Sequence, residues 1–274
     1  MQIENSQSDS ITDHIRELLR RGSRAVLATI VESQQLIVGA KLLVTEEGGH
    51  AGDFGNSELN QAVIEQAGAF LSSPEETKTS RVVELAPQLR DLADSIILFE
   101  HIKAEPRLVI AGAGHVGASL ARLAALVGYR VTLIDDRAKF VARELFSSPA
   151  EQSIELVAAQ NWIDAMHDAI GNGRGVSVAI VTRGHKQDED CLRAAAETNP
   201  NYIGMIGSKR RTNIVLNKLY EEGVADDQLR RVHAPIGLDI GAVSPEEVAL
   251  AILAEIVNKR HGGSGESMSA WRRD

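Results

Sequence analysis

Residues that could do chemistry gather in four short segments in the second half of this sequence. The first segment spans residues 112–117, reads GAGHVG and has the G-x-G-x-x-G spacing. It follows an apolar run and opens a helical pattern, and Asp135 ends the next apolar run, 18 residues after Gly117. This combination is typical of a dinucleotide-binding turn between a strand and a helix. The segment therefore favours a site for a phosphate-bearing ligand.

Each residue type in this turn has a physical reason. Gly112 permits a tight turn, Gly114 lets a phosphate approach the backbone, and Gly117 lets helix and strand pack closely. Unpaired N–H groups at the start of the helix attract an anion, and Asp135 can accept a hydrogen bond from a ribose hydroxyl. The candidate ligand contacts are Gly112, Gly114, His115, Val116, Gly117 and Asp135. The alternative is a turn that keeps this shape and binds another ligand or none.

The second segment, TRGHKQD at residues 182–188, follows another predicted strand. Loops at the carboxyl ends of parallel strands line one crevice, so Arg183, His185 and Asp188 are expected near the glycine turn. His185 could act as an acid, a base or a hydrogen-bond donor. Alternatively, Asp188 caps the next helix and His185 is only solvated. We predict no metal site, because His115, His185 and Asp188 lack a metal-ligand spacing.

The third segment, GSKRR at residues 207–211, holds the densest positive charge of the sequence. Ser208 can cap the helix that starts here, and Lys209, Arg210 and Arg211 could hold the anionic end of a ligand. A solvated basic helix start is the alternative. Cations at a helix N-terminus oppose its dipole, so we expect a negative group nearby.

The fourth segment, HAPIGLDIGA at residues 233–242, has the glycines and proline of a fixed, close-packed loop. Its one charged group, Asp239, either contacts the ligand or belongs to a purely structural loop. Cys191 is the only cysteine, and Glu189 and Asp190 precede it. Acidic neighbours raise the pKa of a thiol, so we interpret Cys191 as a buried small apolar residue. We predict no catalytic residue, since no nucleophile–base pair has a suitable spacing.

The elements that must position these segments alternate between apolar strands and helices. We expect a strand before each helical stretch, and a final helix that Ser244, Pro245 and Glu247 start with a capping box. This alternation predicts right-handed βαβ units and a Rossmann-like, doubly wound parallel sheet of at least five strands. The expected strands are 107–111, 130–134, 154–158, 176–181 and 202–206.

A smaller α+β domain is expected to precede this sheet. Helices are predicted at 10–21 and 57–71, and strands at 25–31, 40–45, 81–85 and 95–102. The domain boundaries that follow are 1–105 for the N-terminal α+β domain, 106–261 for the Rossmann-like domain and 262–274 for a disordered tail.

Composition excludes several function classes. Residues 1–105 carry 9 basic and 17 acidic side chains, and the remainder carries 20 and 21. An acidic first half disfavours nucleic-acid binding, which needs a basic face, and an aromatic content of 4% disfavours base stacking. The polar start lacks the pattern of a signal peptide, and the apolar runs are too short to span a membrane. With one cysteine, these features favour a cytoplasmic protein without a membrane partner.

Five strings in this order strongly resemble the XdhC/CoxI family, the xanthine dehydrogenase accessory proteins. They are GAGHVG at 112–117, IDDR at 134–137, TRGHKQD at 182–188, YIGMIGSKRR at 202–211 and HAPIGLDIGAVSPEE at 233–247. The resemblance covers about residues 97–261. In the first domain, residues 38–44 with Gly52 and Glu58 resemble the N-terminal segment of the family less closely.

The resemblance implies a chaperone that binds the molybdenum cofactor (molybdopterin), assists its sulfuration, and inserts it into a client enzyme. The client would be of the xanthine dehydrogenase or carbon monoxide dehydrogenase type. Many members have a cysteine in a Gly-Gly-Cys-x-Glu-like turn, where this chain has Gly55, Asn56, Ser57 and Glu58. Sulfur would then come from a partner cysteine desulfurase rather than from this chain. The sequence leaves open whether the protein forms a homodimer.

Two other functions stay open beside the chaperone. One is an NAD(P)-dependent oxidoreductase that uses the same Rossmann edge, with His185 as its acid or base. The other is a regulatory module that binds a nucleotide.

Overall fold

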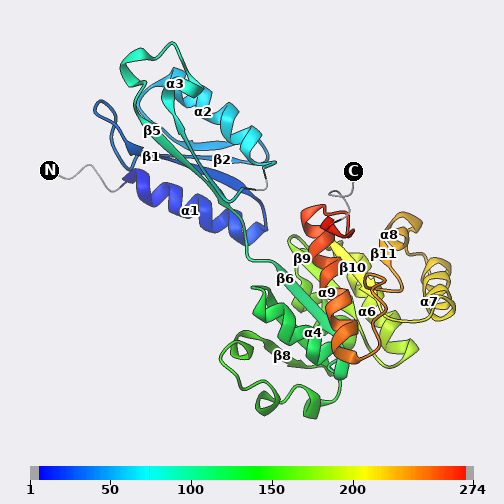
Figure 1. Cartoon of the computed structure of the whole chain (residues 1–274). Helices are drawn as coiled ribbons and strands as arrows, with labels where there is room; N and C mark the ends of the chain where they lie inside the picture. The colour runs from blue at the N-terminus through cyan, green and yellow to red at the C-terminus, as the bar shows by residue number, and fades with distance from the viewer. Residues whose placement is uncertain (1–5, 74, 270–274) are drawn as a thin grey trace. The chain divides into compact units, whose positions relative to one another are not determined.

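The computed structural model describes residues 6–73 and 75–269. The chain divides into two compact units, and the division falls between Ala104 and Glu105 (Figure 1). Residues 270–274 of the tail expected to be disordered, including Trp271, lie outside the described residues. Across the described part of the chain, no helix is both long and apolar enough to cross a membrane.

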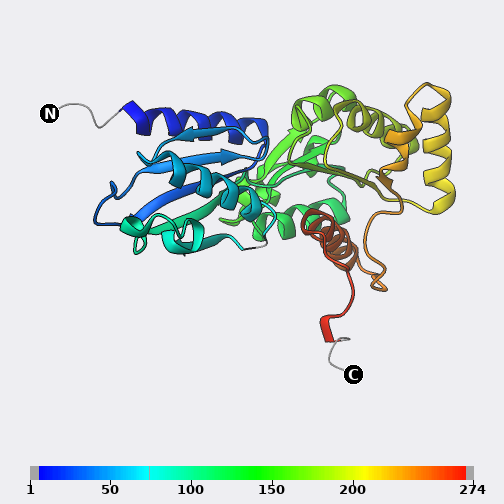
Figure 2. The same cartoon turned by 90° about the horizontal axis from the view of Figure 1, so that it is seen from above.

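The N-terminal unit is a five-stranded antiparallel sheet, in the order β3-β2-β1-β5-β4, with helices on both faces (Figure 2). Its described elements are α1 (Ser6–Arg21), β1 (Ala25–Glu32), β2 (Lys41–Thr45), β3 (His50–Gly52), α2 (Ser57–Phe70), β4 (Thr77–Arg81), α3 (Val82–Leu85), the 3-10 turn Arg90–Leu92 and β5 (Ile96–Ile102). The expected α+β class is confirmed.

Alternation along β1 explains why both faces are covered. Ala25 and Leu27 pack with Ile11 and Leu18 of α1, whereas the residues between them point to the opposite face. There Val26 joins a core with buried residues of α2. Both sets of side chains are removed from water, so the sheet is stabilised from two sides.

One element of this unit was predicted wrongly. The strand expected at 81–85 ends at Arg81, and residues Val82–Leu85 form a short helix. The true strand β4 is the edge of the sheet, and Ser80 is its one buried residue. A polar edge strand has no apolar periodicity to detect, while the apolar residues after it imitate a strand.

The C-terminal unit is a parallel sheet in which the described residues contribute six strands, in the order β8-β7-β6-β9-β10-β11. This is the doubly wound Rossmann order, and it confirms the predicted fold class. Its elements are β6 (Arg107–Ala111), α4 (His115–Leu126), β7 (Arg130–Asp135), β8 (Glu155–Ala158), α5 (Trp162–Ile170), β9 (Val176–Ile180), α6 (His185–Thr198), β10 (Tyr202–Met205), α7 (Lys209–Glu221), α8 (Asp226–Arg230), β11 (Val232–His233) and α9 (Pro245–His261), with 3-10 turns at Ala138–Phe140, Arg143–Leu145 and Glu151–Ser153.

Two apolar cores hold this sheet between its helices. On one face, α4 and α9 pack together, and Leu120 and Ile252 are fully buried there with Leu108 and Ile110 of β6 (Figure 1). On the other face, buried residues of α5, α6 and α7 pack against β9. The predicted capping box starts α9, with Ser244 accepting from the backbone N–H of Glu247. The carboxyl ends of β6, β9, β10 and β11 therefore lie along one edge, and the four sequence segments extend from them.

Candidate ligand-binding site

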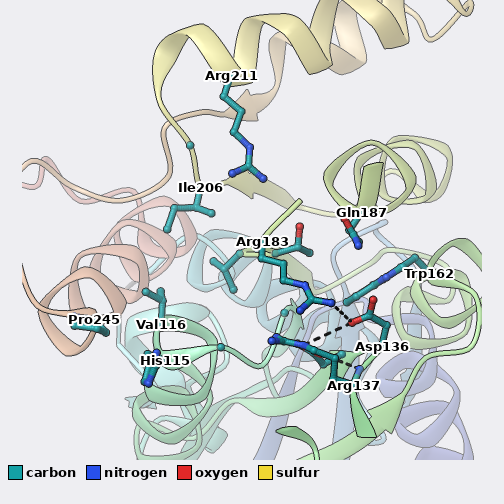
Figure 3. A pocket seen from close by; sticks show the side chains of 16 residues that line it. His115, Val116, Asp136, Arg137, Trp162, Arg183, Gln187, Ile206, Arg211 and Pro245 are labelled. Carbon is teal, nitrogen blue, oxygen red and sulfur yellow. Dashed lines mark hydrogen bonds and ion pairs between the residues drawn. The ribbon is translucent and has the colours of Figure 1, made fainter. Parts of the chain in front are cut away.

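A pocket of about 410 Å³ lies at the carboxyl edge of the parallel sheet. It is centred where the strand order reverses, between β6 and β9, which is where open α/β sheets bind ligands. All of its lining belongs to the C-terminal unit (Figure 3). The lining residues are Gly112, Gly114, His115, Val116, Asp135, Asp136, Arg137, Trp162, Val181, Thr182, Arg183, Gln187, Ile206, Gly207, Arg211 and Pro245.

The glycine turn has little room for side chains. Gly112 has a φ of 109°, a left-handed conformation that favours glycine. A Cβ atom on Gly117 would lie 1.8 Å from the carbonyl oxygen of Gly112, so only glycine lets α4 start this close to β6. A Cβ atom on Gly114, by contrast, would meet nothing within 4 Å. The backbone at Gly114 is therefore open to the pocket.

Asp135 lines the pocket, but its carboxylate is engaged by hydrogen bonds within the protein. Its buried carboxylate accepts hydrogen bonds from the backbone N–H of Ala113, at 2.7 Å, and from Arg137 Nε, at 2.8 Å, and Nη2, at 2.9 Å. Burial raises the pKa of Asp135, but these hydrogen bonds outweigh it and hold the pKa below its usual value. This carboxylate thus fastens the glycine turn to Arg137, and its oxygens are already engaged where a ribose contact was expected.

A second buried carboxylate fastens another arginine. Asp188 of α6 is fully buried and accepts hydrogen bonds from the Thr182 hydroxyl and the Arg211 guanidinium, so it connects the loop after β9 with α6 and α7. Burial raises the pKa of Asp188, although the bonds from Thr182 and Arg211 act against this rise. Asp188 is the negative group expected near the cation cluster. It holds Arg211 in place beside the pocket.

The cations of the pocket are more accessible than its acids. The side chain of Arg183 is 60% exposed and that of Arg211 is 25% exposed, whereas Asp135 and Asp188 are buried. Asp136 is the exception, because it is partly exposed and lies 3.8 Å from both Arg137 Nε and Arg183 Nη2. The surface that a ligand meets is therefore dominated by guanidinium groups.

Two helices begin at this edge with free backbone donors. Gly114 and Gly184 are the N-caps of α4 and α6, and neither helix has a side-chain cap. Their first N–H groups are left for a ligand or water, and the helix dipoles add positive potential. Helix α7 differs, because the hydroxyl of Ser208 accepts from the backbone N–H of Arg211. The arrangement as a whole suits an anionic ligand.

Two polar atoms at the pocket have no partner. Among the buried side-chain atoms of the described residues, Trp162 Nε1 and Arg211 Nε make no hydrogen bond. Both residues line the pocket. Buried donors without partners are unfavourable, so a ligand or water that accepts from them would be stabilising.

The structure brings part of the predicted site together. Seven predicted residues line the pocket: Gly112, Gly114, His115, Val116, Asp135, Arg183 and Arg211. Seven do not: Gly117, His185, Asp188, Ser208, Lys209, Arg210 and Asp239. Gly117 and Asp188 are packed below the lining, whereas His185, Ser208, Lys209, Arg210 and Asp239 are at least partly exposed. Within the described ranges, no three His, Cys, Asp or Glu side chains gather as metal ligands would.

Several lining residues were missed in the sequence. Asp136 and Arg137 directly follow Asp135, and Trp162 follows the Asn161 cap after β8. Their signal was topological, since each comes just after the carboxyl end of a strand. Gln187 was likewise available within the second segment.

The loop before α9 is held by a buried acid. Glu255 accepts from the hydroxyl of Tyr202 at 3.0 Å, from the backbone N–H of Gly237, and pairs with His233 Nδ1 at 2.8 Å. Burial, together with the neighbouring Glu255, raises the pKa of Tyr202. The network fixes the fourth segment and brings Pro245 to the pocket, but leaves Asp239 outside its lining.

The chain is similar in sequence to several curated proteins. The chain is 30% identical over 236 residues to the uncharacterized protein YqeB of Escherichia coli, covering 84% of this chain and 42% of that protein. It is 26% identical to a protein of Bacillus subtilis named as a probable xanthine dehydrogenase subunit, with coverage of 90% and 64%. It is 27% identical to the molybdenum cofactor insertion chaperone PaoD of Escherichia coli, with coverage of 56% and 40%. The chain thus spans between two fifths and two thirds of these relatives.

A solved structure and two family models agree with the fold. A crystal structure of a xanthine dehydrogenase from Bacillus halodurans matches 94% of this chain and 68% of that one, with a TM-score of 0.63 and 18% identity. The model of the XdhC Rossmann domain matches residues 108–256, and that of the XdhC and CoxI family matches residues 18–83. Because these models cover both units and more than half of its length, the chain belongs to the XdhC and CoxI family.

Proposed function

We propose that this protein is a chaperone that binds the molybdenum cofactor and inserts it into a client enzyme of the xanthine dehydrogenase or carbon monoxide dehydrogenase type. The observation that carries the proposal is the pocket at the switch point, with the guanidinium groups of Arg137, Arg183 and Arg211 around it. Membership of the family and the names of two relatives support the same role.

The pocket matches the chemistry of such a cargo. The molybdenum cofactor combines a pterin, which contains a planar pyrimidine ring, with a phosphate and an anionic metal group. A volume of about 410 Å³ falls within the common range for small-molecule sites, roughly 300 to 1,000 Å³. The unpartnered donors of Trp162 and Arg211 and the free N–H groups of α4 and α6 supply hydrogen bonds for it. Arg211 and the glycine turn would hold the anionic end, while the more distant Lys209 and Arg210 would add only long-range attraction.

During sulfuration, this chain would only hold the cofactor. Cys191 is the one thiol of the sequence, and it is buried in α6. Burial first, and then Asp188 and Asp190, raise the pKa of this thiol well above its usual value, so it is a poor nucleophile. Sulfur would therefore reach the bound cofactor from a cysteine desulfurase partner.

The test has a chemical and a functional part. The protein is purified from cells that make molybdopterin, oxidised, and examined for pterin fluorescence. Separately, a molybdoenzyme of the xanthine dehydrogenase type is co-expressed with and without this protein. We expect bound pterin and a several-fold gain in active client. A client that is fully loaded and active without the protein would contradict the proposal.

The glycine turn and the strand order also favour a second candidate, an NAD(P)-dependent oxidoreductase. The engaged carboxylate of Asp135 and the position of His185, outside the pocket lining, argue against it. Substrate oxidation with added NAD at enzyme-like rates by the purified protein would replace the chaperone proposal with this one.

A further inference from the structure

The Arg137 side chain is held flat at one end of the pocket. Its guanidinium carbon lies 3.8 Å from the centre of the Phe140 ring, and its Nε and Nη2 atoms both donate to Asp135. A cation stacked on an aromatic ring and bonded along one edge has little rotational freedom. Arg137 also lines the pocket, so the surface it offers a ligand is its remaining face and edge.

A fixed guanidinium plane is a stacking surface for another flat group. Arginine stacks on aromatic faces through its planar, weakly hydrated cation, which lysine cannot imitate. Phe140 on one side and a ligand ring on the other would enclose the guanidinium between two flat groups.

The groups around this plane can recognise the edge of a ring. Figure 3 shows Asp136, Trp162 and Gln187 at the end of the pocket away from His115 and Pro245. Trp162 is 9% exposed, and its Nε1–H donor has no partner among the described residues. Asp136 is an acceptor that is only weakly paired, at 3.8 Å from Arg137 and Arg183. A donor and an acceptor at one end complement a ring that has both amino groups and unprotonated nitrogen or oxygen atoms.

We propose that this end of the pocket is a subsite for a planar, amino-bearing nitrogen heterocycle, which stacks on Arg137 and hydrogen-bonds to Trp162 and Asp136. The phosphate of the same ligand then lies toward Arg211 and the glycine turn. The inference rests on the proposed function in placing the cargo in this pocket, and it adds the orientation of that cargo. Such a ring occurs in a pterin and in the base of a nucleotide, and the test distinguishes these two sources.

The test measures binding to the full chain by calorimetry with three phosphorylated probes. Ribose 5-phosphate has no heteroaromatic ring, cytidine 5′-monophosphate has a nucleobase, and 6-hydroxymethylpterin phosphate has a pterin. We expect at least one ring-bearing probe to bind about tenfold or more tighter than ribose 5-phosphate, because stacking on a side chain typically has that effect. Preference for the pterin probe identifies the pterin as the ring, and preference for the cytidine probe identifies a nucleotide.

Two variants and one control test whether the tighter binding of ring-bearing probes depends on Arg137 and Trp162. Arg137→Lys keeps the charge but removes the plane, and Trp162→Phe keeps an aromatic ring but removes the N–H donor. Both should lose most of the tenfold advantage of the ring while ribose 5-phosphate binding changes less than about twofold. The control is Arg122→Lys, since Arg122 also stacks on a phenylalanine, Phe146, at 4.9 Å, but lies outside the pocket lining.

A spectroscopic signal gives an independent readout. The sequence has two tryptophans, so in a Trp271→Phe background the emission comes from Trp162. A ring-bearing probe should quench this emission, whereas ribose 5-phosphate should not.

Three results would overturn the inference: equal binding of all three probes, an unchanged ring advantage in Arg137→Lys and Trp162→Phe, or no binding of any probe. Failure of the proposed function looks different. In that case ring-bearing probes bind and the variants lose the advantage, yet the client enzyme matures equally well without this protein.

Discussion

Arg211 of α7 reaches the pocket because its guanidinium is paired with the fully buried carboxylate of Asp188 on α6. The pair joins the segments that follow two neighbouring strands, β9 and β10. The two residues come from different predicted segments, and of the two only Arg211 lines the pocket. Asp188 is therefore a positioning residue for the site.

Replacing Asp188 with Asn should destabilise the C-terminal unit by about 1–3 kcal/mol, less than for a fully buried pair because the Arg211 side chain is 25% exposed. A neutral amide leaves the partly buried Arg211 without its counter-charge, and this loss is expected to be large for buried pairs and smaller where the partner reaches solvent. Urea unfolding followed by tryptophan fluorescence measures the change. The matched control is Lys218→Gln, which removes an exposed ion pair with Glu189 between the same two helices and should cost about 0–1 kcal/mol. Equal losses in the two variants would contradict the positioning role.

Gly117→Ala should destabilise the fold, whereas Gly114→Ala should weaken ligand binding. The new methyl group at Gly117 would lie 1.8 Å from a backbone oxygen, so the start of α4 must move, at a cost of about 1–3 kcal/mol or more. At Gly114 the methyl group meets open space at a φ of −66°, which alanine adopts freely. That variant should fold normally but weaken the binding of phosphorylated probes by about tenfold, since it obstructs the approach to the turn. Thermal unfolding and calorimetry separate the two effects.

Arg211→Gln should weaken the binding of 6-hydroxymethylpterin phosphate much more than Arg210→Gln or Lys209→Gln. Arg211 lines the pocket, whereas the other two are exposed outside its lining. Exposed charges act over distance and are screened by salt, so their small contribution should vanish at about 0.5 M salt. Titrations at two salt concentrations test this. Similar losses for all three variants would instead support a cation cluster that acts as a whole.

The acid sensitivity of the fold should depend on Asp135. Its hydrogen bonds from Arg137 and Ala113 hold its folded-state pKa below the usual value. This carboxylate therefore stabilises the fold above about pH 4, and the contribution is lost as pH falls through the lowered pKa. Asp135→Asn should be less stable than the unaltered protein at pH 6, and the difference should shrink toward pH 3. Urea unfolding at several pH values measures it, and a constant difference would contradict the cause assigned here.

Sequence patterns predicted the C-terminal fold well because buried parallel strands are short apolar runs. Val109 and Val178 are buried in such runs, between helices that alternate with them. Two short strands, β3 and β11, were not predicted, because segments of three and two residues are too short to show an alternating pattern. The edge strand β4 was predicted at residues 81–85 instead of Thr77–Arg81 for a related reason, since only Ser80 in it is buried.

The site was predicted in outline but not in its contacts. Segment order placed the glycine turn and Arg183 at one edge, since topology alone fixes which strand ends meet. Whether a side chain faces the pocket depends on its partners, and neither the bond between Asp135 and Arg137 nor that between Asp188 and Arg211 has a sequence signature. Trp162 had only a topological signal, its place after β8, and the missing partner of its indole N–H is visible only in the structure.

Because Cys191 is buried, the rate at which a reagent labels its thiol measures how often the C-terminal unit opens. Its thiol lies in α6, three residues after Asp188, and it is the only one in the sequence. A thiol reagent can reach it only when the packing around α6 opens, so the labelling rate reports the frequency of that event. Bound cargo that tightens Arg211 and Asp188 would slow the reaction, and each variant could be ranked by its labelling half-life without knowledge of the ligand.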